Sequence, residues 1–204
     1  MTKILTLALA ALLLVTTEAQ AALTKGRPLK TGQTTTYGAA GDTTAGLSRM
    51  YNDLGNGVIK DQRTGLFWEK KSYDRSIHDW DNTYTWSTGD NSFNGTAATV
   101  FLATLNTAPC FGGFCDWRLP TLNELETIRD LGHGRPAVPA AFNTDCPGLC
   151  TVTTCSCTCS GYYWSSSTYQ NNPVYAWGVY FTDGGVYYYD KTNGEFVRAV
   201  RSGP

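Results

Sequence analysis

The sequence predicts an α+β domain with two helices, antiparallel hairpins and long loops. Of the 204 residues only 16% are charged and 21 are glycine, a composition that favours many turns and few long helices. Two segments have a helical period of apolar residues, and short alternating apolar segments lie on both sides of them. Strands at both ends with helices between them suit a fold in which the terminal strands pair.

The N-terminus has the features of a secretory signal peptide over residues 1–21. Lys3 precedes an apolar run from Ile4 to Val15, and Ala19-Gln20-Ala21 has the small residues of a cleavage site. The run covers about a dozen residues, fewer than the roughly 20 that a membrane-spanning helix needs. We therefore expect a secreted or periplasmic protein with no membrane span.

The rest of the chain is predicted to be an arm followed by one domain. Residues 22–47 are rich in Thr and Gly without periodicity and predict an extended N-terminal arm, whereas residues 48–204 are long enough for one hydrophobic core. The net charge is −1 and like charges do not cluster. This pattern gives no electrostatic basis for binding nucleic acid.

A hairpin is predicted at the start of the domain. The turn Leu54-Gly55-Asn56-Gly57 tolerates positive φ and connects residues 51–53 with residues 58–61. A second turn at residues 62–65 introduces Leu66-Phe67-Trp68. The C-terminal part repeats this chemistry, with turns at residues 182–185 and 191–194. The strands predicted there are residues 162–165, 175–181, 186–190 and 195–198, and Trp177, Val179 and Phe181 share one face.

The first predicted helix covers residues 97–106. Thr96 is its candidate N-cap, and its apolar side is expected to contain Val100, Phe101, Leu102 and Leu105.

The second helix has a stronger start signal. Pro120 ends an extended segment, Thr121 can cap the helix, and Glu124 three residues later can complete a capping box. Gly132 stands where a C′ residue is expected. The predicted buried stripe is Leu122, Leu125, Ile128 and Leu131.

Seven cysteines in an exported chain predict disulfides, with one thiol left over. Cys110 and Cys115 bracket a short flexible loop and are the clearest pair. The others are Cys146, Cys150, Cys155, Cys157 and Cys159, in a long loop over residues 134–161 that has no helical period and is expected to bury little apolar surface. Two disulfides and a spare thiol are expected there, and a thiolate metal site is the alternative.

Other candidate chemistry is sparse. His78 and His133 have no second ligand at metal-binding spacing, and motifs for a nucleophile elbow, a phosphate loop or a zinc protease are absent from the sequence. We therefore predict no enzyme and no cofactor. Calcium is compatible with an oxygen-rich region, although a solvated polar loop is the preferred interpretation. Its residues are Asp74, Asp79, Asp81, Asn82, Asp90 and Asn91.

Four stretches in fixed order resemble a secreted bacterial domain family, the one named after the C-terminal domain of the collagen-like adhesin Lcl. They are Asp116-Trp117-Arg118-Leu119-Pro120-Thr121-Leu122-Asn123-Glu124-Leu125-Glu126, Thr64-Gly65-Leu66-Phe67-Trp68, Tyr163-Trp164-Ser165-Ser166-Ser167 and Phe196-Val197-Arg198-Ala199-Val200-Arg201. The resemblance implies a C-type-lectin-like fold for residues 48–204, remotely akin to formylglycine-generating enzymes. Those enzymes use a cysteine pair, but the chain has no cysteine after Gly161.

Aromatic residues gather near the C-terminus together with Asn and Asp. Rings beside amides and carboxylates offer stacking area and hydrogen bonds for a sugar or a protein surface. The candidate ligand-binding residues are Tyr169, Asn171, Asn172, Tyr175, Tyr187, Tyr189, Asp190 and Asn193. We predict a non-enzymatic recognition module for glycans or surface proteins. The alternatives are an oxidoreductase like the formylglycine-generating enzymes and a structural component of the cell envelope.

Overall fold

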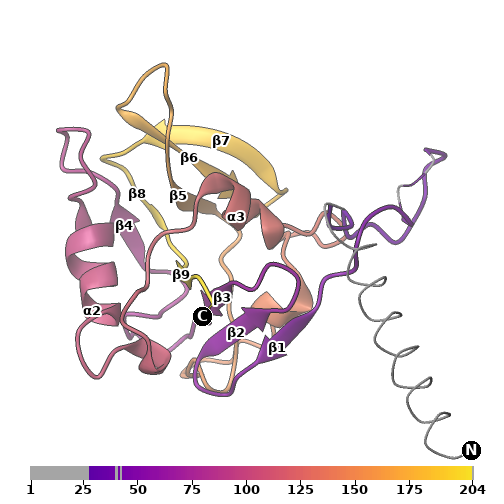
Figure 1. The fold of residues 1–204 in the computed structure, drawn as a ribbon, viewed down its shortest axis with the longest axis horizontal. Coiled ribbons are helices and arrows are strands. Elements are labelled where there is room, and N and C mark those ends of the chain that lie inside the picture. The colour runs from indigo at the N-terminus through magenta and orange to yellow at the C-terminus, as the bar shows by residue number, and fades with distance from the viewer. Residues whose placement is uncertain (1–27, 40, 42, 204) are drawn as a thin grey trace, which may run out of the picture.

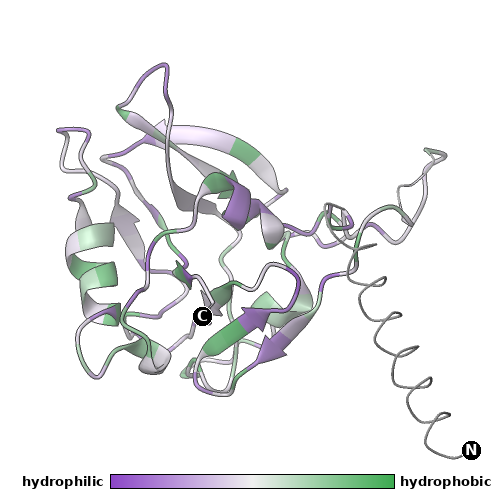
Figure 2. Ribbon diagram, in the orientation of Figure 1, coloured by the Kyte–Doolittle hydropathy of each residue, from purple (hydrophilic) through white to green (hydrophobic). Residues whose placement is uncertain are grey.

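The computed structural model describes residues 28–39, 41 and 43–203. The predicted signal peptide lies outside these residues. Within them, the fold is α+β, as predicted, with two sheets connected by short helices and long loops (Figure 1). The strands pair antiparallel except for β5 and β8, which run parallel. In the hydropathy colouring, β2 and the helix that leads into α2 contain much of the green (Figure 2).

A four-stranded sheet joins the two ends of the domain, in the order β1-β2-β3-β9. Its strands are β1 (Tyr51–Asp53), β2 (Val58–Asp61), β3 (Phe67–Glu69) and β9 (Val200–Arg201). The predicted hairpin is confirmed, because Asn52 pairs with Lys60 in antiparallel register. Trp68 pairs with Val200, which brings the C-terminal strand against β3. The two ends of the domain therefore share one sheet, as expected, although β9 pairs with β3 and lies at the opposite edge from β1.

The second sheet has five strands in the order β4-β8-β5-β6-β7. They are β4 (Thr83–Thr85), β5 (Tyr162–Thr168), β6 (Tyr175–Tyr180), β7 (Gly185–Asp190) and β8 (Gly194–Phe196). The predicted turn at residues 191–194 exists, but the strands on its two sides do not pair. Lys191 accepts from the amides of Trp86 and Ser87, both at 2.9 Å, so the chain leaves β7 and inserts β8 between β4 and β5. Consequently β7 is an edge strand.

The first predicted helix is present as a π-helix, η1 (Ala97–Leu102), continued by α2 (Ala103–Leu105). Ala97, Phe101 and Leu105 are buried, because residues four apart lie on the same side of the helix. Two details were wrong. Val100 is 46% exposed, and Thr96 does not cap the helix, since its Oγ1 accepts from the Thr85 amide of β4 at 2.9 Å.

The second helix is α3 (Leu122–Thr127), and its capping box is confirmed. Thr121 Oγ1 accepts from the Glu124 amide at 3.3 Å, and Glu124 Oε2 accepts from the Thr121 amide at 2.8 Å. Leu125 and Ile128 are fully buried, as predicted. The helix is shorter than expected, so Leu131 lies beyond it and is 42% exposed.

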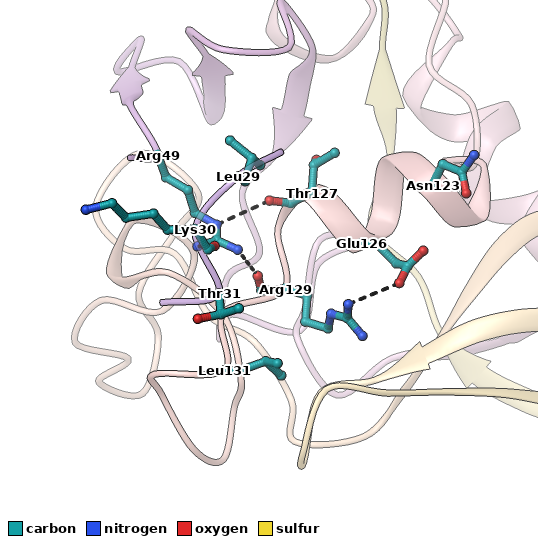
Figure 3. Close-up of a pocket in the computed structure, with 9 residues that line it drawn as sticks. All are labelled: Leu29, Lys30, Thr31, Arg49, Asn123, Glu126, Thr127, Arg129 and Leu131. Atoms are coloured by element: carbon teal, nitrogen blue, oxygen red, sulfur yellow. Dashed lines mark hydrogen bonds and ion pairs between the residues drawn. The ribbon is translucent and has the colours of Figure 1, made fainter. Parts of the chain in front are cut away.

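Arg49, two residues after the arm, explains why α3 ends early. The Arg49 guanidinium donates to the carbonyls of Thr127 and Arg129, which satisfies the end of the helix in place of another turn (Figure 3). Gly132 is not a C′ residue. A Cβ there would lie 1.8 Å from the Gly32 carbonyl oxygen, so its role is to let two backbones cross. The cavity of about 280 Å³ at this junction is lined by side chains that fasten the arm.

Two hydrophobic clusters hold the sheets together. One joins η1 and the signature residues Trp117 and Leu119 to Trp164 of β5. The other packs α3 and the first sheet against Tyr163, Val179 and Phe181. The cysteine-rich loop contributes Val138 and, from the 3-10 helix η3 (Ala140–Phe142), Phe142. The expectation that this loop buries little apolar surface was wrong, because its first third folds into the second cluster.

Candidate functional site

The cysteines form three disulfides and leave one thiol. Cys110–Cys115 is confirmed and closes the loop that contains the 3-10 helix η2 (Phe111–Gly113). In the cysteine-rich loop, Cys146 pairs with Cys157 and Cys150 pairs with Cys155, and Cys159 is free. Two disulfides and a spare thiol were the preferred prediction for this loop. The sequence left open which cysteine is unpaired, and the structure identifies it as Cys159.

The loop brings sulfur atoms together without making a thiolate site. The Sγ atoms of Cys150, Cys155 and Cys157 lie within 4.8 Å of one another, but all three are oxidised in disulfides and lack the thiolate that binds a metal. Burial raises the pKa of the Cys159 thiol to about 11. This thiol is therefore protonated near neutral pH and a weak nucleophile.

The oxygen-rich residues considered for calcium serve local turns. Asp74 accepts from Ser72 and Ser76, and Asp79 accepts from the amides of Arg75 and Asp81. Asp90 belongs to a separate loop, where it accepts from Ser87, Ser92 and Asn94. These hydrogen bonds support the interpretation as polar loops.

A buried charge network, which the sequence analysis did not find, connects the two halves of the domain. It consists of Glu69, Lys71, His78 and Arg198. Glu69 Oε1 lies 3.1 Å from Lys71 Nζ and 2.7 Å from His78 Nδ1, and Oε2 accepts from the Ala199 amide at 2.9 Å. Arg198 donates to the Glu69 carbonyl at 2.7 Å. The Glu69, Lys71 and Arg198 side chains are almost completely inaccessible.

The electrostatics of this network follow from burial and pairing. Burial alone would raise the pKa of Glu69, but Lys71 and His78 outweigh it and hold that pKa below its usual value. Burial lowers the pKa of Lys71 and of Arg198. Arg198 also donates to the Cys157 carbonyl at 2.6 Å, so it ties the cysteine-rich loop to β3. No substrate-sized opening reaches these charges among the described cavities, and we assign them a structural role.

The structure divides the predicted ligand-binding tyrosines between the two faces of the β6–β7 pair. Trp177 pairs with Tyr188 and Gly178 pairs with Tyr187. Because opposed residues share a face and neighbours alternate, Tyr188 and Tyr187 project to opposite sides. The predicted residues therefore do not form one site.

One face carries four rings that we call the aromatic platform: Tyr169, Tyr175, Trp177 and Tyr188. Tyr169 and Tyr188 are stacked, with centroids 4.5 Å apart and an interplanar angle of 13°. Trp177 lies edge-on to both, at 5.3 and 5.4 Å. Tyr175 contacts Tyr188 at 5.3 Å. Tyr188 is 46% exposed and the other three rings are half-buried, so the platform presents ring surface to solvent.

The polar predicted residues lie in or next to the segments that carry this platform. Asn171 and Asn172 are exposed in the tight connection between β5 and β6, which closes through a 2.9 Å bond from the Tyr169 amide to the Tyr175 carbonyl. Asp190 lies opposite Tyr175 on the same face, and its Oδ1 accepts from Thr192. Asn193 is exposed in the turn that follows β7.

The opposite face carries Tyr187 and Tyr189 together with two residues that were not predicted, Tyr180 and Asp183. These four residues line a cavity of about 260 Å³ that we call the tyrosine pocket. The Tyr180 and Tyr187 rings are 6.3 Å apart at 76°. The register across the 182–185 turn fixes which residues of the two strands lie opposite each other. Pairing the strands in this way could have identified Tyr188, Trp177 and Tyr180 from the sequence.

The chain was compared with known proteins. Residues 57–201, more than half of the chain, match the family described as the Lcl C-terminal domain. No curated protein and no solved structure gave a significant match. In the part of the chain that the structure describes, no helix has the length and apolarity needed to cross a membrane. The matched range includes all three disulfides, the charge network and both aromatic faces. The chain belongs to the Lcl C-terminal domain family.

Proposed function

We propose that this chain is a non-enzymatic recognition module that holds a glycan or a surface protein against the aromatic platform. The carrying observation is the packing of four aromatic side chains on an edge hairpin, with Tyr188 46% exposed. Rings packed into a stack lose little conformational freedom on binding, which favours affinity. Membership in a family named for an adhesin's C-terminal domain supports a surface-binding role.

The charges near the platform favour a neutral sugar as the ligand. β6, β7 and the connection over residues 169–174 contain no Lys or Arg, so nothing in these segments would pair with sulfate or sialic acid. The exposed Asn171 and Asn172 amides supply donors and acceptors for hydroxyl groups. Rings provide the apolar area on which the C–H face of a sugar can rest.

The state of the cysteines favours binding over oxidoreductase chemistry. A catalyst like the formylglycine-generating enzymes needs a reactive cysteine pair, whereas six of the seven cysteines are in disulfides and the pKa of Cys159 is raised. Three disulfides also support export to an oxidising compartment, and we propose a secreted or periplasmic location.

A printed array of neutral, sialylated and sulfated glycans together with extracellular matrix proteins tests this proposal. Tyr188→Ala should weaken binding at least tenfold, as removal of a central aromatic anchor does. Tyr187→Ala is the matched control, since Tyr187 is the next residue of the same strand and is similarly exposed at 48% but faces the other side. Binding of no ligand, or binding that Tyr188→Ala leaves unchanged, would favour the structural-component alternative.

A further inference from the structure

We propose that the tyrosine pocket is a second, separate binding site, and that its ligand is a quaternary ammonium group of the choline type. The pocket is formed by residues of the β6–β7 hairpin and its turn. In this hairpin, β7 is the outermost strand of the five-stranded sheet (Figure 1). Its lining is three tyrosines and one carboxylate, Tyr180, Tyr187, Tyr189 and Asp183. The site is on the opposite face from the aromatic platform and does not depend on that platform.

Two glycines create the space for the rings. Gly185 pairs with Tyr180 across the hairpin, and a Cβ at Gly185 would lie 2.5 Å from the Tyr187 ring. Gly178 pairs with Tyr187, and a Cβ there would lie 2.6 Å from the ring of Tyr162. Because neither glycine has a Cβ, the rings of Tyr187 and Tyr162 can pack directly against the backbone of the sheet.

The core holds this arrangement in place. Tyr162 is buried, its ring lies 4.7 Å from that of Tyr189, and its hydroxyl lies 2.9 Å from the Tyr187 carbonyl oxygen. One wall of the pocket is therefore supported from the buried side. Tyr187 and Tyr189 nevertheless remain 48% and 44% exposed, which leaves ring surface for a ligand.

The electrostatics of the pocket call for a cation. The face of an aromatic ring is negative and attracts a cation within about 6 Å of its centroid, and the nearly perpendicular Tyr180 and Tyr187 rings form a corner of that size. Asp183 adds a full negative charge. Its Oδ1 accepts from the Gly185 amide at 2.8 Å, while no side chain of the described residues forms an ion pair with it.

The cations of the chain itself do not fill this corner. The lysine and arginine groups that lie over rings contact Phe67, Phe101, Phe114, Phe142 and Trp86. Within the described residues, no lysine or arginine group lies over a tyrosine of the pocket. Arg129 donates to the Gly184 carbonyl at 3.0 Å but forms no ion pair with Asp183.

The small number of acceptors favours a methylated ammonium over a primary one. A primary ammonium has three N–H donors that lose water on entering a pocket, and each needs a new acceptor. Asp183 is the only charged acceptor in the lining. A quaternary ammonium has no N–H group, and its methyl groups contact the rings directly. Free choline, phosphocholine attached to a glycan, and a phosphatidylcholine headgroup all present this group.

Isothermal titration with tetramethylammonium, phosphocholine and ethanolamine tests the assignment. Phosphocholine and tetramethylammonium should bind, and ethanolamine, the primary-amine analogue of choline, should bind at least tenfold more weakly. Asp183→Asn should weaken binding about tenfold, because the amide oxygen can still accept from Gly185 but the charge is lost. Tyr187→Ala should abolish it. Tyr188→Ala, on the other face, should leave it unchanged.

Vesicles of phosphatidylcholine and of phosphatidylglycerol separate the sources of the headgroup. Retention by phosphatidylcholine vesicles alone would assign a lipid surface, and binding of free phosphocholine without vesicle retention would assign a soluble or glycan-attached group. Equal affinity for ethanolamine and tetramethylammonium would overturn the proposal, as would titration heats that Asp183→Asn and Tyr187→Ala leave unchanged. Tyr188→Ala changes only the platform. A negative glycan result would therefore contradict the proposed function and leave the proposal for the tyrosine pocket untouched.

Discussion

Replacing Glu69 by Gln is expected to destabilise the domain by about 3–4.5 kcal/mol. The substitution keeps the shape of the side chain and the acceptor for the Ala199 amide. It removes the negative charge that lies 3.1 Å from Lys71 Nζ, where both side chains are at most 2% exposed. The lysine would then be a buried cation without an ion pair, and only the more distant Asp79 would attract it.

The loss of stability in Glu69→Gln is limited because Lys71 can release its proton. Lys71 can escape the uncompensated charge by becoming neutral, and neutralising an ordinary lysine at pH 7 costs about 4.6 kcal/mol. In that state the unfolded chain binds one more proton than the native one, so the stability of the variant rises by about 1.4 kcal/mol per pH unit. Its deficit relative to the parent protein should therefore shrink between pH 7 and pH 9.

A second substitution separates the cost of losing the ion pair from the cost of leaving the Lys71 charge buried without a partner. Glu69→Gln combined with Lys71→Met removes both charges and fills a similar volume, so it should recover at least about 2 kcal/mol of the loss. Glu126→Gln is the control for a surface pair, because Glu126 and Arg129 are each 31% exposed and 3.2 Å apart. It should cost less than about 1 kcal/mol.

Urea unfolding of the oxidised protein, followed by far-UV circular dichroism, measures these free energies. Equal slopes for all variants would show that the differences come from stability. A loss below about 1 kcal/mol for Glu69→Gln, or a double variant less stable than Glu69→Gln alone, would refute the reasoning that an unpaired buried lysine causes the cost.

Three further outcomes follow from the arm and from α3. Gly132→Ala should detach the arm, because the new Cβ would lie 1.8 Å from a backbone carbonyl of the arm, whereas Gly134→Ala has no atom within 4 Å and is its control; limited proteolysis of the arm distinguishes them. Thr121→Ala removes the helix cap and should cost about 1 kcal/mol in urea unfolding. The hydrogen bond from Arg118 lowers the pKa of Glu124. The ionised Glu124 therefore stabilises the fold above the ordinary glutamate pKa, and this stabilisation is lost as the pH falls through the lowered pKa. Glu124→Gln should flatten this acid dependence of the melting temperature.

Features that depend on neighbours along the chain could be predicted from the sequence. The capping box needs only two residues three apart, and both of its hydrogen bonds are present. Cys110 and Cys115 are five residues apart in the sequence, so each is the nearest cysteine along the chain to the other. The first hairpin follows from glycine at positions with positive φ, such as Gly55 and Gly57.

Features that join distant segments could not be predicted. Arg49 ends α3 from 78 residues away, and nothing near it in the sequence distinguishes it from a surface arginine. Glu69, Lys71 and Arg198 likewise have the sequence context of ordinary charges. Their burial arises only when β9 joins β3 and places Ala199 and Arg198 against Glu69. The length of a helix and the location of a charge were thus decided by tertiary contacts.

The division of the C-terminal tyrosines into two sites has the same origin. Alternation along residues 186–190 was visible in the sequence, but an inner strand would have buried both of its faces. β8 inserts beside β5 and leaves β7 at the edge, so Tyr187, Tyr188 and Tyr189 are all exposed by 44–48%. One backbone therefore carries the aromatic platform on one side and the tyrosine pocket on the other. Ligands on these two faces would not compete for space, so saturating phosphocholine should leave the affinity for a platform-bound glycan unchanged, and competition between the two would mean that a single site had been divided wrongly.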